Sequence, residues 1–520
     1  MSGLIEVDDL TIAYPMADGE IFRALKGITI EVSKGQIVGV VGESGAGKST
    51  IGKTALGLLD ENAVIEGGEV RLDGKDIARL AEAAYAPVRG NRIGYIYQNP
   101  MTALNPVLTI GEQLIEAIEA NTDKRGDAAR SYAIQLLEQA EVPEAEDRLS
   151  KYPHQLSGGL CQRVVFAIAI SAEPDLIIAD EPTTALDVTV QKAVLDTLKR
   201  LARQDNIAII LITHDMGVVA EMCDYVYVLR HGAMVEHGLT ADILAKPTQA
   251  YSRELMASIP RIDRKVDRFA VPGLGNQGDR TRALKFLMER KAEAEVAPGE
   301  PLLSVRNLSK TFGNKSTMFS GERAFKALDG VSFDVFPGET LGIVGESGSG
   351  KSTVGRIILG LHNADPGHEI RYKGKDVSSF KSRADRLAYQ RSVQCIFQDP
   401  YSSLNPRMSA GENITHAIKA HGVMGRSAAR ELAGDLLELV GLPRASATKM
   451  PHAFSGGERQ RIGIARALSF RPDFLFCDEP TSALDVTVQA ELLNLMKDLQ
   501  DELGLTLLFV SHDLAVVRQM

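Results

Sequence analysis

The stretch GESGAGKST at residues 42–50 returns as GESGSGKST at residues 345–353. Each copy follows a short apolar run and precedes a segment with helical spacing, a pattern typical of a strand, a phosphate-binding loop and a helix. Glycines in such a loop let backbone N–H groups converge on a phosphate at the amino end of the helix. The alternative, a glycine-rich turn that happens to contain lysine, explains two copies in the same context poorly. The chain therefore carries two predicted nucleotide-binding loops.

In each loop the lysine is expected to hold the β- and γ-phosphates, and the serine after it to bind Mg²⁺. ATP and Mg²⁺ are the cofactors that this chemistry requires. The loop residues predicted to bind nucleotide in the first half are Gly42, Glu43, Ser44, Gly45, Ala46, Gly47, Lys48, Ser49 and Thr50. Those in the second half are Gly345, Glu346, Ser347, Gly348, Ser349, Gly350, Lys351, Ser352 and Thr353.

Further motifs recur in the same order in both halves. The peptides QNPMTALNP and QDPYSSLNP begin at Gln98 and Gln398, and DEPTTALDVTVQ and DEPTSALDVTVQ begin at Asp180 and Asp478. A repeat period of about 300 residues indicates duplicated domains rather than a solenoid.

The repeat also sets the expected domain boundaries. We expect one domain at 1–260 and another at 301–520, joined by a linker at 261–300 that mixes charges with glycine and proline and contains a short helix. The second half ends at the position where the first half continues. The second domain is therefore expected to be truncated at its carboxyl end.

The apolar runs predict an α/β fold. In the first half, buried-strand candidates at 36–41, 93–98, 176–180 and 207–213 alternate with helical segments, which implies a mostly parallel sheet. The segment between about 100 and 157 has few β-branched runs and is predicted to be an α-helical insertion between two strands.

Each DEPT motif places two adjacent carboxylates at the end of an apolar strand. Asp180 and Asp478 suit the coordination of Mg²⁺, and Glu181 and Glu479 suit the polarisation of an attacking water. An acidic pair at a strand end is usually only solvated. Here its distance from the phosphate loop and its DEPT continuation favour catalysis.

Composition limits the location and the partners. The 520 residues include no stretch of roughly 18 uncharged apolar residues and no signal-peptide pattern at the amino end, so we expect a cytosolic chain. The four cysteines lie far apart, as reduced thiols do rather than disulfides or a metal site. A net charge of −10 and a pI near 5.6 give no electrostatic footprint for nucleic acid.

With SGG, the two glutamines, DEPTxALD and a later histidine, both halves resemble ABC-type ATPase domains. The peptides YPHQLSGG, QNPMTALNP, QDPYSSLNPRM and KPTQAYSRELMASIP are similar to the ATPase subunits of dipeptide and oligopeptide importers. The resemblance implies tandem P-loop NTPase domains, each with a mostly parallel core sheet, an N-terminal antiparallel β region and an α-helical insertion.

The resemblance also implies two head-to-tail ATP sites, in which Lys48 faces Ser455 and Lys351 faces Ser157. The phosphate bound by one half would be capped by the signature of the other half. The signature residues are Ser157, Gly158 and Gly159 in the first half and Ser455, Gly456 and Gly457 in the second. Further implied roles are γ-phosphate or Mg²⁺ sensing by Gln98 and Gln398, a γ-phosphate contact by His214 and His512, and adenine stacking by Tyr14 and Phe312. The implied metal ligands are Ser49, Gln98, Asp180, Ser352, Gln398 and Asp478.

One departure concerns the first signature, in which Cys161 stands where the second has Arg459. The site that pairs Lys351 with the first signature is therefore expected to be weaker. Because Glu479 and His512 are present, two active sites are still predicted.

The predicted function is the ATP-hydrolysing subunit of an importer for peptides or related small solutes. Its implied partners are two transmembrane permease subunits and a solute-binding protein, and its implied location is the cytoplasmic face of the cell membrane. Two other classes share the twin domains. A ribosomal twin-ABC factor is disfavoured by the acidic pI, the DEPTxALD form and the linker, and a DNA-repair ABC ATPase by the lack of a zinc-bearing cysteine cluster.

Overall fold

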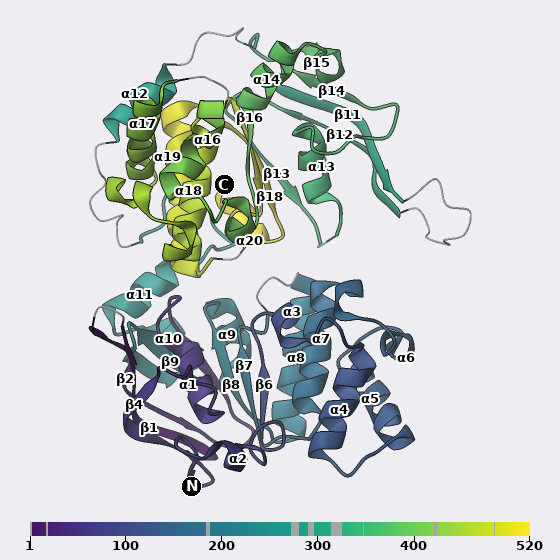
Figure 1. Cartoon of the computed structure of the whole chain (residues 1–520), viewed down its shortest axis with the longest axis vertical. Helices are drawn as coiled ribbons and strands as arrows, with labels where there is room; N and C mark the ends of the chain where they lie inside the picture. The colour runs from purple at the N-terminus through teal and green to yellow at the C-terminus, as the bar shows by residue number, and fades with distance from the viewer. Residues whose placement is uncertain are drawn as a thin grey trace. The chain divides into compact units, whose positions relative to one another are not determined.

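The computed structural model describes residues 3–16, 19–183, 188–271, 280–289, 296–313, 325–346, 348–420, 424–482 and 484–520. The chain forms two compact units, Met1–Ile259 and Pro260–Met520 (Figure 1). Ser347, one of the predicted loop residues, lies outside the described residues, as do positions 184–187 of the first DEPTTALD motif.

The core sheet of the first unit has the strand order β10-β9-β3-β8-β7-β6. Only β10 and β9 pair antiparallel, and the other neighbours are parallel. The strands are β3 (Ile37–Val41), β6 (Ile93–Ile96), β7 (Leu176–Asp180), β8 (Ala208–Thr213), β9 (Tyr225–Arg230) and β10 (Ala233–Leu239). Every residue of β3, β7 and β8 is buried, as expected for apolar strands covered on both faces. The predicted, mostly parallel sheet is confirmed.

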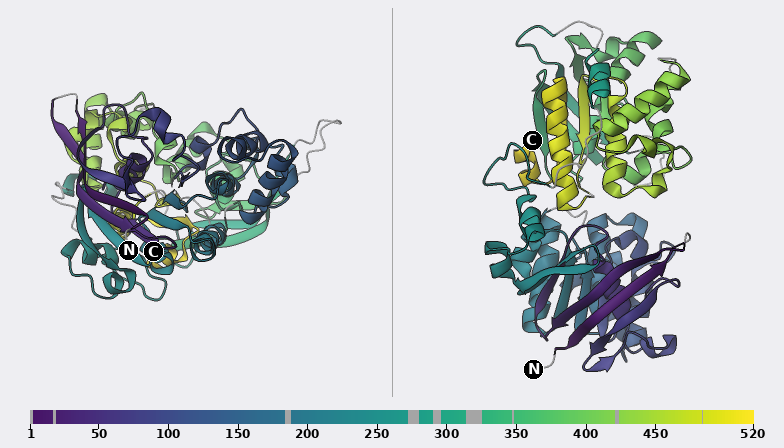
Figure 2. Two further views of the ribbon diagram at one scale, coloured as in Figure 1. Left: turned by 90° about the horizontal axis from the view of Figure 1, so that it is seen from below. Right: turned by 90° about the vertical axis from the view of Figure 1, so that its left-hand side faces the viewer.

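A second sheet in this unit is antiparallel, with the order β2-β1-β4-β5 (Figure 2, purple strands). It consists of β1 (Ile5–Pro15), β2 (Ile21–Val32), β4 (Val64–Leu72) and β5 (Lys75–Asp76). This is the expected N-terminal antiparallel region. Its buried side chains form one core with the phosphate-loop helix α1 (Lys48–Ala55) and one face of the parallel sheet.

The helical insertion lies between β6 and β7, as predicted. It contains α3 (Pro100–Ala103), α4 (Ile110–Asn121), α5 (Asp127–Gln139), α6 (Ala145–Arg148), a 3₁₀ turn (Pro153–Gln155) and α7 (Gly158–Ile170). Thr109 and Glu112 form a capping box that fixes the start of α4. The unit's other helices are α2 (Glu82–Tyr85), α8 (Val188–Gln204), α9 (Met216–Met222), α10 (Thr240–Ala245) and α11 (Ala250–Ala257).

The second unit repeats this architecture. Its antiparallel sheet, β12-β11-β14-β15, comprises β11 (Leu303–Phe312), β12 (Phe325–Val335), β14 (Glu369–Tyr372) and β15 (Lys375–Asp376). Its parallel sheet, β13-β18-β17-β16, comprises β13 (Thr340–Val344), β16 (Val393–Ile396), β17 (Phe474–Asp478) and β18 (Thr506–Ser511). The main helices are α13 (Lys351–Ile358), α14 (Arg383–Ser392), α15 (Pro400–Ser403), α16 (Ala410–Ala420), α17 (Arg426–Leu439), α18 (Gly456–Leu468), α19 (Val486–Leu503) and α20 (Leu514–Gln519).

In the described part of the chain, β13 pairs with β18, whereas its counterpart β3 pairs with both β8 and β9. Val344 at the end of β13 is 46% exposed, whereas its counterpart Val41 is fully buried.

Much of the segment expected to be a linker packs against the second unit. Phe269 and the helix α12 (Thr281–Met288), which the sequence predicted as a short helix, contribute to this unit's core. Residues 261–269, which we call the strap, bond to α19 and α20. Asn494 pairs with both backbone groups of Phe269, and Lys497 Nζ donates to two strap carbonyls at 2.8 Å each.

Candidate nucleotide sites

Both phosphate loops are closed by their own lysine. Lys48 Nζ donates to the carbonyl oxygens of Gly42 and Glu43 at 2.8 and 2.9 Å, and Lys351 Nζ makes the equivalent bonds at 2.8 and 2.7 Å. Both lysines are buried. The ammonium groups thus lie over the loops at the amino ends of α1 and α13, where the backbone dipoles favour an anion.

The glycine before each lysine is needed for its backbone conformation. Gly47 and Gly350 have φ angles of 93° and 95°. A Cβ atom on Gly47 would also lie 2.5 Å from the carbonyl oxygen of Ala24. No other residue type fits there without distortion of the loop.

The strand-end aspartates are bonded to the loop serines. Ser49 Oγ donates to Asp180 Oδ1 at 2.9 Å, and Ser352 Oγ donates to Asp478 Oδ1 at 2.8 Å. Burial raises the pKa of both aspartates. A serine hydroxyl and a carboxylate held together at the edge of a phosphate loop are oxygen ligands of the kind that Mg²⁺ accepts alongside nucleotide phosphates. The donor set of each unit therefore fits this ion.

A glutamine and a histidine meet on each strand-end glutamate. Gln98 Nε2 donates to Glu181 Oε2 at 2.6 Å, and His214 Nδ1 lies 3.1 Å from Glu181 Oε1. In the second unit, Gln398 Nε2 is 2.9 Å and His512 Nδ1 is 3.2 Å from Glu479 Oε2. In each unit, the glutamine and the histidine that meet on the glutamate lie more than one hundred positions apart in the sequence.

The two strand-end glutamates share an uncommon backbone conformation and lie beside charged side chains. Glu181 and Glu479 have φ angles of 48° and 44°, an uncommon conformation for non-glycine residues that recurs at functional sites. Burial alone would raise the pKa of Glu479, but the hydrogen bond to His512 and the positive charges of His512 and Lys351 lower it. The same hydrogen bond raises the pKa of His512. An anionic glutamate facing a protonated histidine is therefore favoured in this site.

The signature serines start two helices. Ser157 accepts from Leu160 N at 3.4 Å, while Ser455 and Glu458 form a full capping box on α18. Gly158 and Gly159, like Gly456 and Gly457, occupy the first turns of α7 and α18. Both serines are exposed, and such helix starts suit an anion. Their pairing with the phosphate loop of the other unit stays a prediction.

Cys161 takes over one contact of the arginine that it replaces. Its Sγ lies 3.4 Å from the Pro153 carbonyl, and Arg459 Nε donates to the equivalent Pro451 carbonyl at 2.7 Å. Arg459 also stacks over Tyr401 at 3.8 Å from the ring centre. The first signature helix therefore lacks a charge-assisted bond and a cation–π contact that the second one has.

The two aromatic residues expected to stack on adenine end the first strands of their units. Tyr14 is half-buried, and burial and the nearby Asp60 raise its pKa. Phe312 is 39% exposed, with Lys310 Nζ 5.1 Å from its ring centre. Contact of either ring with adenine remains a prediction.

Tyr95 is a site residue that the sequence analysis missed. Its hydroxyl donates to Asp180 Oδ2 at 2.7 Å. Tyr95 lies on β6, which pairs with β7, the strand that carries the aspartate. The sequence signal for Tyr95 is its place in the predicted strand 93–98, which ends at Gln98.

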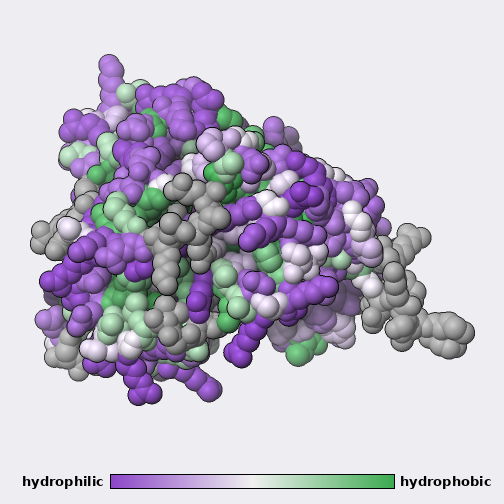
Figure 3. Space-filling view, turned by 90° about the horizontal axis from the view of Figure 1, so that it is seen from above, coloured by the Kyte–Doolittle hydropathy of each residue, from purple (hydrophilic) through white to green (hydrophobic). Residues whose placement is uncertain are grey.

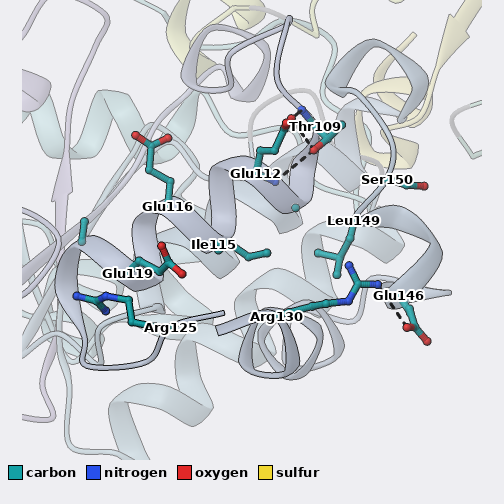
Figure 4. Close-up of a pocket in the computed structure, with 12 residues that line it drawn as sticks. Thr109, Glu112, Ile115, Glu116, Glu119, Arg125, Arg130, Glu146, Leu149 and Ser150 are labelled. Atoms are coloured by element: carbon teal, nitrogen blue, oxygen red, sulfur yellow. Dashed lines mark hydrogen bonds and ion pairs between the residues drawn. The ribbon is translucent and has the colours of Figure 1, made fainter. Parts of the chain in front are cut away.

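A groove in the helical insertion lies apart from these residues (Figure 4). It has a volume of about 810 Å³ and is lined by residues of α4 and by residues near α5 and α6. Glu112 turns back to Thr109, and Arg130 reaches Glu146. Glu116 and Glu119 add two more carboxylates.

None of the described helices is long and apolar enough to cross a membrane. The face of the chain drawn in Figure 3 is mostly hydrophilic, with small separate hydrophobic areas.

Comparison with known proteins matches an ABC transporter family model to residues 25–184 and 328–482. A glutathione import ATP-binding protein of Salmonella paratyphi A is 41% identical over 99% of this chain and 83% of its own length. The protein of the same name from Escherichia coli K12 gives the same identity and coverage. Among solved structures, a bacterial ABC transporter cassette aligns with 45% of this chain and 98% of its own, at 30% identity and a TM-score of 0.42.

Proposed function

Because this chain belongs to the ABC transporter family and is one of its ATPases, we propose that it energises the import of glutathione or of related short peptides. The observation that carries the proposal is the same constellation in both units: a lysine over the loop, a serine–aspartate pair, and a glutamate bonded to a glutamine and a histidine. The names of the relatives support the solute class.

Each residue has a role in this proposal. Lys48 and Lys351, with the loop N–H groups, bind the β- and γ-phosphates. Ser49 with Asp180, and Ser352 with Asp478, would hold Mg²⁺, which neutralises phosphate charge when bound. Gln98 and Gln398 bond to the glutamates that follow these aspartates in the chain, and they would report on the ion or the γ-phosphate.

Glu181 and Glu479 orient the attacking water and accept its hydrogen bond. Hydrogen bonds from the glutamine and contacts with the histidine hold each glutamate in place. Bound ATP offers His214 and His512 a γ-phosphate partner instead of the carboxylate. Closure of the two units, with each signature serine on the other unit's phosphate, would complete two sites, and hydrolysis would reopen them.

Two permease subunits and a solute-binding protein are the proposed partners, which place the chain at the cytoplasmic face of the cell membrane. The helical insertions are the proposed permease contacts. On α4, Glu116 is exposed and Glu119 is half-buried, whereas the equivalent positions of α16 are the exposed His416 and Lys419. This difference in charge supports two different permease segments rather than two identical ones.

Single-turnover ATP hydrolysis tests the two sites. Glu181→Gln and Glu479→Gln keep the side-chain shape but remove the carboxylate, so each variant should lose about half of the hydrolysed ATP, and the double variant nearly all of it. Glu221→Gln, an exposed residue of α9, is the matched control and should leave hydrolysis unchanged. If only one glutamate mattered, the proposal of two active sites would be wrong.

The transport role needs a separate measurement. The chain should co-purify from host membranes with two multi-span proteins, and glutathione presented with the binding protein should stimulate hydrolysis. Recovery with ribosomes or DNA, and none with membranes, would leave the ATPase in place but overturn the importer.

A further inference from the structure

The two nucleotide sites differ at the aspartate proposed to bind Mg²⁺. In the first unit, Asp180 accepts hydrogen bonds on both oxygens, from Ser49 at 2.9 Å and from Tyr95 at 2.7 Å. In the second unit, the position of Tyr95 is occupied by Cys395, one residue before Ile396 at the end of β16. A thiol is a weak donor, whereas a phenol is a strong one.

An exchange of side chains between neighbouring strands accompanies this difference. Tyr95 lies beside Ile178 in the β6–β7 pair, and Cys395 lies beside Phe476 in the equivalent β16–β17 pair. Each unit thus has one aromatic ring and one smaller side chain in this strand pair. The ring lies on β6 in the first unit, but on β17, the equivalent of β7, in the second.

In both units the ring packs against a glycine of the helix that follows the phosphate loop. A Cβ atom on Gly52 would lie 3.1 Å from Tyr95 Cε2, and one on Gly355 would lie 2.0 Å from Phe476 Cζ. The ring therefore fills similar space in the two units, as a compensated exchange in a packed core must. Only the ring of the first unit carries a hydroxyl that reaches the aspartate.

We infer that Tyr95 is a positioning residue for Asp180, and that it makes the first site bind a divalent cation more tightly than the second. The inference rests on the proposed function, in which Asp180 and Asp478 are Mg²⁺ ligands. A carboxylate held at both oxygens is fixed in rotation, so it loses less freedom when it binds a cation. Loss of such an outer partner typically lowers metal affinity about 10- to 100-fold.

Binding of Mn²⁺ to the ADP-loaded 520-residue chain, followed by the EPR signal of free Mn²⁺, tests the inference without hydrolysis. The unmodified chain should show two affinities that differ by about tenfold or more. Asp180→Asn should remove the tighter Mn²⁺-binding site, and Asp478→Asn should remove the weaker one. These two variants therefore assign each affinity class to its unit.

Tyr95→Phe keeps the ring and removes only the hydroxyl, so it should weaken the tight class about tenfold. Tyr97→Phe is the control. It also removes a phenol hydroxyl, from a ring whose centre lies 4.6 Å from that of Tyr95, and it should leave both Mn²⁺ affinities unchanged. The reverse exchange, Cys395→Tyr with Phe476→Ile, should strengthen the weak class.

Equal affinities for the unmodified chain and Tyr95→Phe would overturn the inference, while leaving the ATPase proposal intact. No saturable Mn²⁺ binding by the unmodified chain with ADP would overturn the Mg²⁺ part of the proposed function, and this inference with it.

Discussion

Gln519, in the last turn of α20, is expected to be a major link between the strap and the second unit. Its side chain is fully buried. Its Oε1 accepts from Val266 N at 2.8 Å, and its Nε2 donates to the carbonyl oxygens of Arg261 and Arg264 at 2.7 and 2.8 Å. Gln519→Ala removes all three bonds and leaves one N–H and two carbonyl groups of the strap without these hydrogen-bond partners.

The expected cost follows from these bonds. A buried hydrogen bond contributes about 1 kcal/mol net, so the variant should lose about 2–3 kcal/mol of the free energy of unfolding of the second unit. For a domain of this size, that corresponds to a fall of about 5–10 °C in its melting temperature. Amide exchange in α20 and the strap should also become roughly 30- to 160-fold faster.

Calorimetry and hydrogen exchange with mass spectrometry measure both effects on the full chain. Glu221→Ala is the matched control, because Glu221 occupies the equivalent position of α9 in the first unit and is exposed. It should change stability by less than about 0.5 kcal/mol. A melting temperature for Gln519→Ala within about 1 °C of the unmodified chain, with unchanged exchange of the strap, would refute the reasoning.

Two further predictions concern stability. Arg459→Cys copies the first signature into the second unit, and it removes the bond to the Pro451 carbonyl and the stacking on Tyr401. We expect the free energy of unfolding of the second unit, measured by calorimetry, to fall by about 1–3 kcal/mol. An unchanged melting temperature would contradict this. Burial would raise the pKa of Glu236, but the nearby Ser252 hydroxyl and the hydrogen bonds from Thr248 and from Gln249 N lower it to about 2. Its stabilisation is therefore present above about pH 4.5 and lost as the pH falls toward 2, so Glu236→Gln should flatten the acid side of the first unit's stability curve.

The connection between the units shows what local sequence patterns leave out. Mixed charges with glycine and proline predicted a linker at 261–300, yet residues 261–269 and α12 pack on the second unit. The partners of this segment, such as Asn494, Lys497 and Gln519, lie more than 220 positions away, and they are ordinary polar residues of amphipathic helices when read locally.

The sequence by itself determined the duplication, the α/β class with its helical insertion, and the residue types of both nucleotide sites. It could do so because loop glycines, strand-end carboxylates and helix caps are local devices whose spacing is set by the backbone. Tertiary structure alone decided that Gln98 and His214 meet on Glu181, and that the hydroxyl of Tyr95 reaches Asp180 where the second unit has Cys395. These contacts join different strands of one parallel sheet, and the order of strands that brings them together is a property of packing rather than of any single segment.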